Sequence, residues 1–368
     1  MAKDKHKVKP PIGRANGILL VVSILLIVGA VLVAGYTSIM NWTPLAEVEE
    51  TVNSDGSTVQ GSVATIDEDI KTPESEAGRV VNFLVAGIDY NTTDATAGVS
   101  RGKLTDVIMV VQIDLETGSV SALQIPRDTW VGTNVSATGK INAVYGLSGI
   151  DGLAEVIYDR LLIPIDHYVT VDMDGFIAIV DAIGGVTITI DETFTLEGVT
   201  FTPGTHTLSG IEGEKFVREG HCRSGGDIGR IKAQRQFLAA LFSEMKDLSA
   251  SELTSLASVV MQNVTTDLSV GTALSLVQEI LTMDTDNMSF YMLPGQTATA
   301  YNGQSIWSAH KDELAAILNE HFRPYSDKVP AENLPIEEVA NTVDYYDDNS
   351  ATVTDILEGN DGEEDNAA

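Results

Sequence analysis

The sequence contains a single cysteine, Cys222, among 368 residues. One thiol excludes an intramolecular disulfide, so a folded domain of this chain must be stabilised by its hydrophobic core alone. Hydrophobic residues make up 43% of the chain, which is enough for the core of one large domain or two small ones.

Positive charge is also scarce, with 22 Lys and Arg against 53 Asp and Glu and a formal net charge of −31. This charge disfavours nucleic acid as a partner, because binding a phosphate backbone requires a net basic face, and we expect none. The acidic residues concentrate in 41–78 and near the C-terminus, where large apolar side chains are few. This composition is typical of solvated segments. We expect an acidic extracellular linker over 41–78 and an acidic, disordered tail over 326–368.

One long stretch, residues 17–40, carries no charge. As a helix it would be about 36 Å long, enough to cross a bilayer core of about 30 Å. Basic residues precede it and Glu47, Glu49 and Glu50 follow it. The positive-inside rule then predicts a cytoplasmic basic tail (1–16), one transmembrane helix (17–40) and an extracellular remainder in the cell membrane. A cleaved signal peptide fits less well, because its apolar core is typically only 7–15 residues long.

Residues 79–325 alternate between strand-like and helix-like patterns. Apolar runs predict strands at 79–88, 107–113, 119–125 and 289–293, and amphipathic stretches predict helices, among them 143–162, 209–218, 227–246, 270–283 and 308–321. This alternation is typical of an α/β fold. We expect a single α/β/α domain over 79–325, with a central mixed sheet covered by helices on both faces.

The two strands 107–113 and 119–125 are joined by a short turn and should form a hairpin. In an antiparallel pair the start of the first strand lies beside the end of the second. Asp106 and Arg127 should therefore emerge at one edge of the sheet, and Pro126 should end the ladder just before Arg127. A simple ion pair would explain these two residues equally well.

A second cationic group surrounds the start of the predicted helix 227–246. Arg218, Arg223 and Arg230 flank the turn Ser224-Gly225-Gly226. A helix N-terminus, free backbone N–H groups and forked guanidinium donors together form a phosphate-binding site. For Lys232 and Arg235, further along the helix, we prefer the interpretation of a solvated basic face.

Several motifs occur in a fixed order: GIDY (87–90), RGKLTDVIM (101–109), IPRD (125–128), GKIN (139–142), DHYVTVD (166–172), IGGV (183–186), FVR (216–218) and DIGRIKAQRQFL (227–238). Together they closely resemble the LytR-CpsA-Psr proteins of bacterial cell envelopes, over nearly all of 79–325. The resemblance implies a metal-dependent phosphotransferase that moves an anionic glycopolymer, teichoic-acid-like or capsular polysaccharide, from a polyprenyl pyrophosphate carrier to peptidoglycan. It also implies an apolar tunnel for the lipid tail.

The resemblance assigns roles to individual residues of this chain. Mg²⁺ (or Mn²⁺) would be held by Asp106 and Asp89, with Asp94 as a competitor for the second position. The pyrophosphate would be bound by five arginines: Arg101, Arg127, Arg218, Arg223 and Arg230. Of these, Arg127, Arg218 and Arg230, together with Asp106, would form the catalytic set. Many family members carry a further arginine where this chain has Gly220, and Arg223 is a candidate to replace it.

Two alternative functions remain open at this point. A pyrophosphatase that releases the glycan from the lipid carrier would use the same site, with water in place of the acceptor. A membrane-anchored binding or regulatory protein of the transcriptional-attenuator type is the other. The short segment before the predicted span argues against it, because about sixteen residues are too few for a DNA-binding fold. The general base, for which Asp227 is conceivable, is left unassigned.

Overall fold

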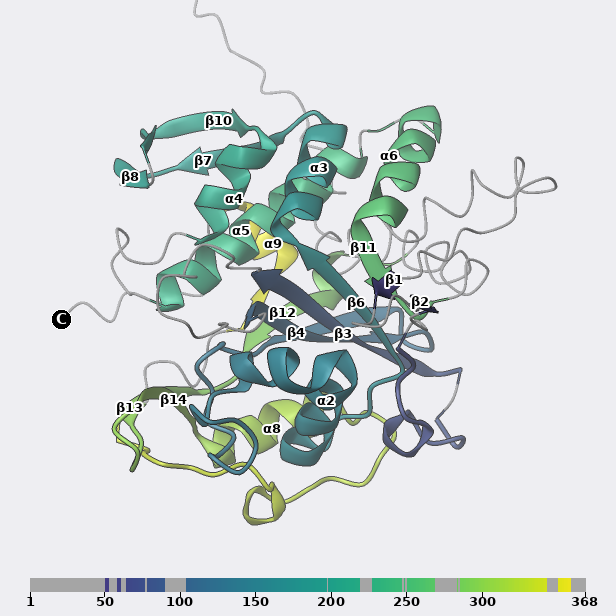
Figure 1. Cartoon of the computed structure of the whole chain (residues 1–368), viewed down its shortest axis with the longest axis vertical. Coiled ribbons are helices and arrows are strands. Elements are labelled where there is room, and N and C mark those ends of the chain that lie inside the picture. The colour runs from purple at the N-terminus through teal and green to yellow at the C-terminus, as the bar shows by residue number, and fades with distance from the viewer. Residues whose placement is uncertain are drawn as a thin grey trace, which may run out of the picture.

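The computed structural model describes residues 50–52, 58–60, 64–76, 78–89, 104–196, 198–218, 227–246, 248, 250–268, 283, 285–342 and 350–358. Its centre is a seven-stranded sheet with the order β11-β6-β3-β4-β5-β12-β15 (Figure 1). The strands are β3 (Val80–Asp89), β4 (Leu104–Asp114), β5 (Ser119–Gln124), β6 (His167–Asp172), β11 (Val264–Thr266), β12 (Met288–Met292) and β15 (Ala351–Thr352). The sheet is mixed as predicted, because β3–β6 and β5–β12 are parallel and the other pairs antiparallel.

Helices cover both faces of this sheet, as predicted (Figure 1). On β3, Phe83 and Val85 pack into the core on one face, and Leu84 and Ala86 into the core on the other. Because both faces are covered, the strand reads as a continuous apolar run. One face carries α2 (Val144–Leu161) and α8 (Lys311–His321), and the other carries α3 (Met173–Ile183), α5 (Asp227–Lys246), α6 (Ala250–Asn263) and α9 (Val353–Glu358).

A third, smaller core lies beyond the sheet, beside α3 and α5. There α4 (Gly210–Arg218) packs Phe216 against Phe194 and Phe201, whose rings stack with centroids 4.7 Å apart. Two antiparallel strand pairs build this region: β7 (Val186–Ile190) with β10 (Gly204–Leu208), and β8 (Phe194–Leu196) with β9 (Val199–Phe201). Separate pairs are β1 (Glu50–Val52) with β2 (Thr58–Gln60), and β13 (Gly295–Thr299) with β14 (Ser305–Ala309). Short 3-10 helices are η2 (Glu68–Ile70), η4 (Ile141–Ala143), η5 (Thr285–Asn287) and η6 (Ala331–Asn333).

The folded unit extends past both predicted limits, 79 and 325. Ile66 and Ile70, in the predicted linker, and Leu334 and Ile336, in the predicted tail, are buried in the core on the α2 and α8 face. Further along, 350–358 adds β15 to the sheet edge and α9 to the opposite face. The prediction of a solvated linker and a disordered tail is therefore wrong for 64–76, 326–342 and 350–358. A few apolar side chains spaced among acidic ones are enough to anchor these segments.

Two predicted segments lie outside the described residues: the basic tail with its transmembrane helix, 1–40, and nearly all of the helix over 270–283. Within the ranges that the structure describes, no helix has the length and apolar character needed to span a membrane.

Candidate functional site

Asp106 and Arg127 meet at one edge of the central sheet, as the hairpin register predicted. Arg127 Nη1 lies 2.8 Å from Asp106 Oδ1, and the two side chains remain 30% and 15% exposed. The pairing follows from the register, in which Met109 of β4 lies opposite Gln124 of β5. The start of β4 and the residues after β5 therefore share this edge, so an anionic and a cationic group are held together within reach of solvent.

The position of Asp106 depends on a β-bulge. Gly87 of β3 pairs with Val107, but the next residue, Ile88, pairs with Thr105, so Asp106 is left without a partner residue on β3. Bulges of this kind bend the strand and re-aim a side chain, and they are common beside functional sites. The sequence alone places Asp106 near the strand start, whereas the bulge decides where its carboxylate points.

The loop after Arg127 is fixed by backbone hydrogen bonds on two sides. The Asn142 N–H donates to the Arg127 carbonyl at 3.1 Å, and the Trp307 N–H of β14 donates to the Asp128 carbonyl at 2.8 Å. Lys140 Nζ adds an ion pair to Asp128 Oδ1 at 3.1 Å. The motifs IPRD and GKIN thus form one rigid corner that carries Arg127.

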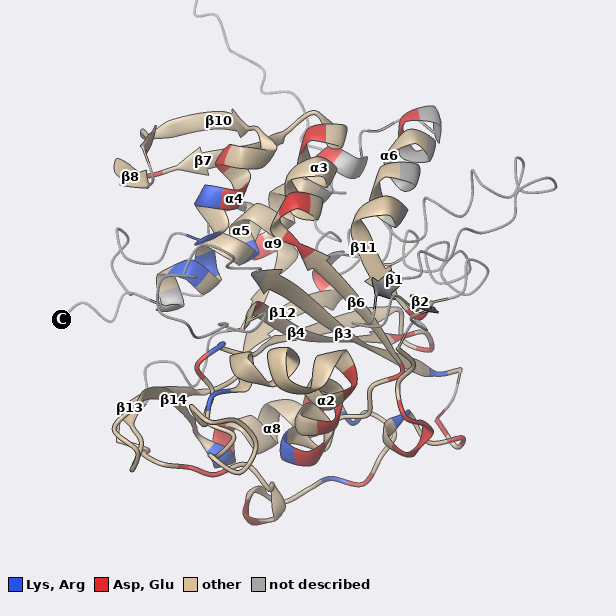
Figure 2. Cartoon of the chain, in the orientation of Figure 1, with Lys and Arg blue, Asp and Glu red and all other residues tan. Residues whose placement is uncertain are grey.

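Arg218 and Arg230 are brought towards this edge by a buried glutamine. Gln234 lies one turn after Arg230 on α5, accepts a hydrogen bond from Gln124 Nε2 at 2.6 Å, and donates to the Val217 carbonyl at 3.3 Å. The bonds join α5 and the end of α4 to the last residue of β5, three residues before Arg127. Figure 2 shows Lys and Arg on α4 and α5, while α3 carries acidic residues. The parts of α4 and α5 that bear Arg218 and Arg230 are thus tied to the strand that leads to Arg127, and the Arg218 side chain itself pairs with Glu214 Oε1 at 2.6 Å.

The burial of two polar residues of α5 was not predicted from the sequence. Gln234 was not predicted to matter, and Arg235 was interpreted as part of a solvated face, yet both are buried, with 4% and 7% of their surface exposed. The guanidinium carbon of Arg235 lies 6.0 Å from the centroid of the Phe290 ring on β12. The interpretation of a solvated face is wrong for Arg235, because α5 packs against the sheet along the side that bears it. Arg230 is buried to the same degree, at 7% exposed.

An apolar cavity of about 90 Å³ lies between the sheet and helices α3, α4 and α5. Gly87 and Val107, beside the bulge, line it on the sheet side, and Val217 and Gln234 line it on the helix side. A Cβ atom at Gly87 would lie 3.1 Å from the Val107 Cβ, tighter than an ordinary contact. Glycine at this position thus lets β3 and β4 approach closely beside the cavity.

The structure describes some of the other predicted site residues and not others. Arg101, Arg223, Asp94 and Gly220 lie outside the described residues. Asp89 ends β3, with its backbone beside Leu104, two residues from Asp106. Asp227 is the first residue of α5.

The described part of the chain holds no group of three or more His, Cys, Asp or Glu that could bind a metal ion by itself. Mg²⁺ commonly needs only one or two carboxylates, with substrate phosphate oxygens and water as its other ligands. Asp106, whose carboxylate is partly exposed at the sheet edge, fits this smaller requirement, and Asp89 is the last residue of the neighbouring strand β3.

The sequence model described as the LytR_cpsA_psr family matches residues 47–323. The chain belongs to the LytR_cpsA_psr family. The match begins well before the predicted limit of 79, in agreement with the packing of 64–76.

Similar members of the LytR_cpsA_psr family include two curated proteins. The polyisoprenyl-teichoic acid–peptidoglycan teichoic acid transferase TagU of Bacillus mycoides is 30% identical over 264 residues, which cover 69% of this chain and 82% of TagU. The cell wall biosynthesis protein LcpA of Corynebacterium glutamicum is 26% identical over 258 residues, 61% of this chain. The chain spans about half of the length of LcpA, at 50%. Among solved structures, B. subtilis TagV matches with a TM-score of 0.58 and 28% identity, over 68% of this chain and 99% of TagV.

Proposed function

We propose that this protein is a phosphotransferase that moves an anionic glycopolymer, teichoic-acid-like or capsular, from a polyprenyl pyrophosphate carrier to peptidoglycan. The observation that carries the proposal is the Asp106–Arg127 pair at the sheet edge, with Arg218 and Arg230 on the adjoining helices and an apolar cavity beneath. Family membership and the activity named for the relative TagU support it.

The arginines suit a pyrophosphate. A guanidinium presents several N–H donors in a fixed fork and binds phosphate oxygens with charge-assisted hydrogen bonds. During phosphoryl transfer negative charge spreads over the phosphate oxygens, and preorganised cations that stabilise it supply most of the catalysis. Arg127 contributes from a rigid corner, and Arg218 and Arg230 contribute from helices tied to the same strand through Gln234.

The lipid part of the carrier suits the cavity. Val107 lines the cavity and is the chain neighbour of Asp106, so a pyrophosphate at the sheet edge would have its attached isoprenyl chain close to this apolar space. Burying apolar chain there is favourable by about 25 cal/mol per Å² removed from water. The cavity thus offers a reason for a lipid-linked donor over a soluble sugar nucleotide.

We include Mg²⁺ (or Mn²⁺) in the proposal, bound through Asp106 and Asp89. Such an ion would supply Lewis-acid stabilisation of the charge on the phosphates. The chain's own contribution would be to hold the two carboxylates at neighbouring strand ends. Attachment to the cell membrane through 17–40, with the catalytic domain outside, also belongs to the proposal, because it would place the site where peptidoglycan lies.

The test uses the full chain in detergent with MgCl₂, a polyprenyl pyrophosphate-linked glycan and peptidoglycan oligomers, and follows the products by mass. A glycan–peptidoglycan phosphodiester that requires Arg127 would support the proposal. Free phosphoglycan without conjugate would indicate the pyrophosphatase alternative. Tight binding of an unchanged lipid would contradict both the phosphotransferase and the pyrophosphatase hypotheses.

A further inference from the structure

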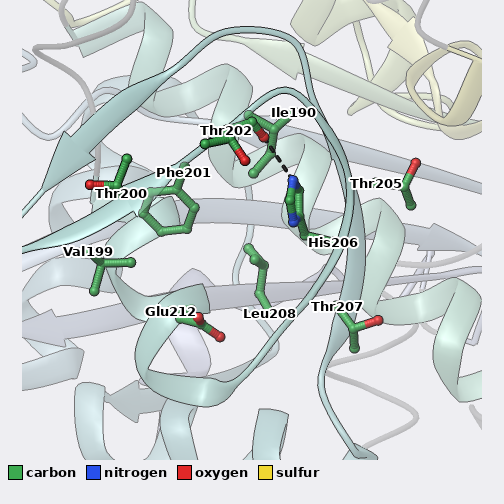
Figure 3. A pocket seen from close by; sticks show the side chains of 10 residues that line it. All are labelled: Ile190, Val199, Thr200, Phe201, Thr202, Thr205, His206, Thr207, Leu208 and Glu212. Atoms are coloured by element: carbon green, nitrogen blue, oxygen red, sulfur yellow. Dashed lines mark hydrogen bonds between the residues drawn. The ribbon is translucent and has the colours of Figure 1, made fainter.

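A second cavity, of about 360 Å³, lies outside the central sheet (Figure 3). It is formed by β9, β10, the end of β7 and the N-terminal end of α4. Its volume falls within the range of about 300–1,000 Å³ that is common for small-molecule sites. None of the residues used in the proposed transfer reaction lines it.

The residues around this cavity are apolar or polar, and four of them are threonines: Thr200, Thr202, Thr205 and Thr207. The hydroxyls of Thr200, Thr205 and Thr207 pair with those of Thr195, Thr189 and Thr187 on the exposed side of their strands. Thr202 carries a hydroxyl that can both donate and accept a hydrogen bond. None of the lining residues within the described ranges is Lys or Arg. A phosphate would find no cation here, in contrast to the arginine-rich sheet edge.

His206 adds a hydrogen-bond acceptor whose identity is fixed. Its Nε2 lies 2.8 Å from the Thr202 carbonyl oxygen, which can only accept, so Nε2 carries the proton. In the neutral ring Nδ1 is then the acceptor. Figure 3 shows the ring among the lining side chains, with the bond to Thr202 at its upper end.

Glu212 supplies a second acceptor at the opposite wall. Its Oε2 accepts hydrogen bonds from the Ser209 N–H at 2.9 Å and the Ser209 hydroxyl at 2.7 Å, which hold the carboxylate in place. The other oxygen, Oε1, accepts no hydrogen bond from the residues that the structure describes. It is therefore available to a donor on a ligand.

The base of the cavity is apolar. Ile190, Phe201 and Leu208 line it and are buried in the third core. A sugar ring has the matching chemistry, since its C–H groups can contact an apolar surface while its hydroxyls donate hydrogen bonds to acceptors such as His206 Nδ1 and Glu212 Oε1. We propose that this cavity binds an uncharged saccharide unit.

The location relates this cavity to the proposed reaction. Glu212 lies near the start of α4 and Arg218 at its end, six residues apart and so about 9 Å along the helix. A glycan whose phosphate is bound near Arg218 could therefore continue into the cavity. This relation rests on the proposed function, whereas the preference for a saccharide rests on the cavity itself.

The test measures binding of two uncharged probes to the full chain in detergent by titration calorimetry. A β-1,4-linked N-acetylglucosamine tetramer represents a wall glycan, and maltotetraose represents a hexose polymer. The variant His206→Phe keeps a ring but removes the Nδ1 acceptor from the cavity, and should bind at least tenfold more weakly. Thr187→Val/Thr189→Val is the control, because these side chains lie on the exposed face of the same strand pair, where they pair with Thr207 and Thr205 at 3.2 and 3.1 Å, and it should bind like the wild type.

The outcomes separate the ligand source and the two proposals. Preference for the N-acetylglucosamine tetramer would indicate the acceptor glycan, and preference for maltotetraose the carried polymer; either supports a saccharide site. Binding of neither probe to the wild type, or equal weakening in His206→Phe and in Thr187→Val/Thr189→Val, would overturn it. Because binding is measured without transfer, a chain that transfers glycan but binds neither probe refutes this inference alone. A chain that binds a probe but does not transfer glycan refutes the proposed function alone.

Discussion

Asp106 and Arg127 make an ion pair that is open to solvent, and such pairs contribute little to stability, about 0–1 kcal/mol. A stabilising role therefore gives no strong reason for the bulge that positions Asp106 or for the hydrogen bonds that fix the Arg127 loop. Binding of a ligand gives a reason for both features. A phosphate would take the place of Asp106 beside Arg127, and a cation would take the place of Arg127 beside Asp106. Under the proposed function, the pair would be the resting arrangement of a pyrophosphate and metal site.

The metal role of Asp106 can be tested with a matched variant. Asp106→Asn should raise the Mg²⁺ concentration needed for half-maximal transfer by at least about tenfold, since losing a group that supports a bound metal typically costs 10–100-fold in affinity or activity. Glu116→Gln is the control. Glu116 pairs with Arg79 in the turn at the other end of the same hairpin and should leave the Mg²⁺ dependence unchanged. Unchanged Mg²⁺ dependence in Asp106→Asn would remove Asp106 from the metal site.

His321 should make stability depend on pH. Burial lowers its pKa below 6.5, opposed by the negative charge of Glu320, and its ring stacks on Tyr291 at 4.5 Å between centroids. Because the folded state binds this proton more weakly than the unfolded state, the contribution is present above pH 6.5 and is lost as pH falls through the folded pKa. His321→Phe keeps a stacking ring without titrating.

Urea unfolding at pH 7.5 and 5.5 checks this expectation. The wild type should lose more stability than His321→Phe between these two pH values. An equal loss in both proteins would show that His321 does not contribute to the pH dependence.

The sequence predicted some site residues better than others. The strand pattern and Pro126 were sufficient to place Asp106 and Arg127 together, because an antiparallel hairpin has few possible registers. Gln234 and Arg235 could not be recognised, since whether a polar residue on a helix is buried depends on the strand it packs against. The spacing of Arg230 and Gln234, four residues apart and hence on one helix face, is the signal that was available.

At the scale of elements, α5 is attached to the sheet through two amide side chains. Gln124 and Gln234 are both buried, and their hydrogen bond is 2.6 Å long. Removing one partner leaves the other unsatisfied in the core, at a cost of about 1–3 kcal/mol, whereas removing both costs less than the sum. The link matters for function because it holds the turn of α5 that bears Arg230.

A double-mutant cycle measures this link. Gln124→Leu and Gln234→Leu should each destabilise the chain by about 1–3 kcal/mol in urea unfolding, and the double variant should be less destabilised than the sum of the two. Each single variant should also raise KM for the lipid-linked donor. Strict additivity would show that the two amides act independently.

Several elements in and against the central sheet were predicted well, whereas strands outside that sheet were missed. The strands 79–88 and 119–125 and the helix 227–246 closely match β3, β5 and α5. The strands β10 and β13 were not predicted, because they are short and rich in threonine or glutamine and lack the apolar alternation of a half-buried strand. Ser308 was assigned to the last helix, but it lies in β14 and pairs with Gln296 of β13. The helix begins at Lys311.

At the scale of the whole molecule, the segments outside the predicted domain complete its core. Leu334 and Ile336 close the side that carries α2 and α8, and nearby Glu337 accepts a hydrogen bond from the buried Trp130 at 2.8 Å. Trp130 belongs to the loop that follows Arg127. The C-terminal segment therefore supports the site corner as well as the core, which composition alone could not reveal.

Truncation of these two side chains should be costly. Leu334→Ala and Ile336→Ala should each lower the free energy of unfolding by about 2–5 kcal/mol, as for other buried aliphatic residues. Leu147→Ala is the control, because that side chain is 65% exposed. If all three variants unfolded at the same urea concentration, the segment would not belong to the folded core.

The central claim is that Arg127 acts on the pyrophosphate, and the most direct measurement is the rate of glycan transfer to peptidoglycan oligomers by wild type, Arg127→Ala and Arg79→Ala. Arg79 pairs with Glu116 at the opposite end of the same strands. Removing one preorganised donor to developing charge typically costs about 100- to 1,000-fold in kcat. The account predicts a loss of this size in Arg127→Ala and a near wild-type rate in Arg79→Ala, with both variants folded. A wild-type rate in Arg127→Ala would contradict it.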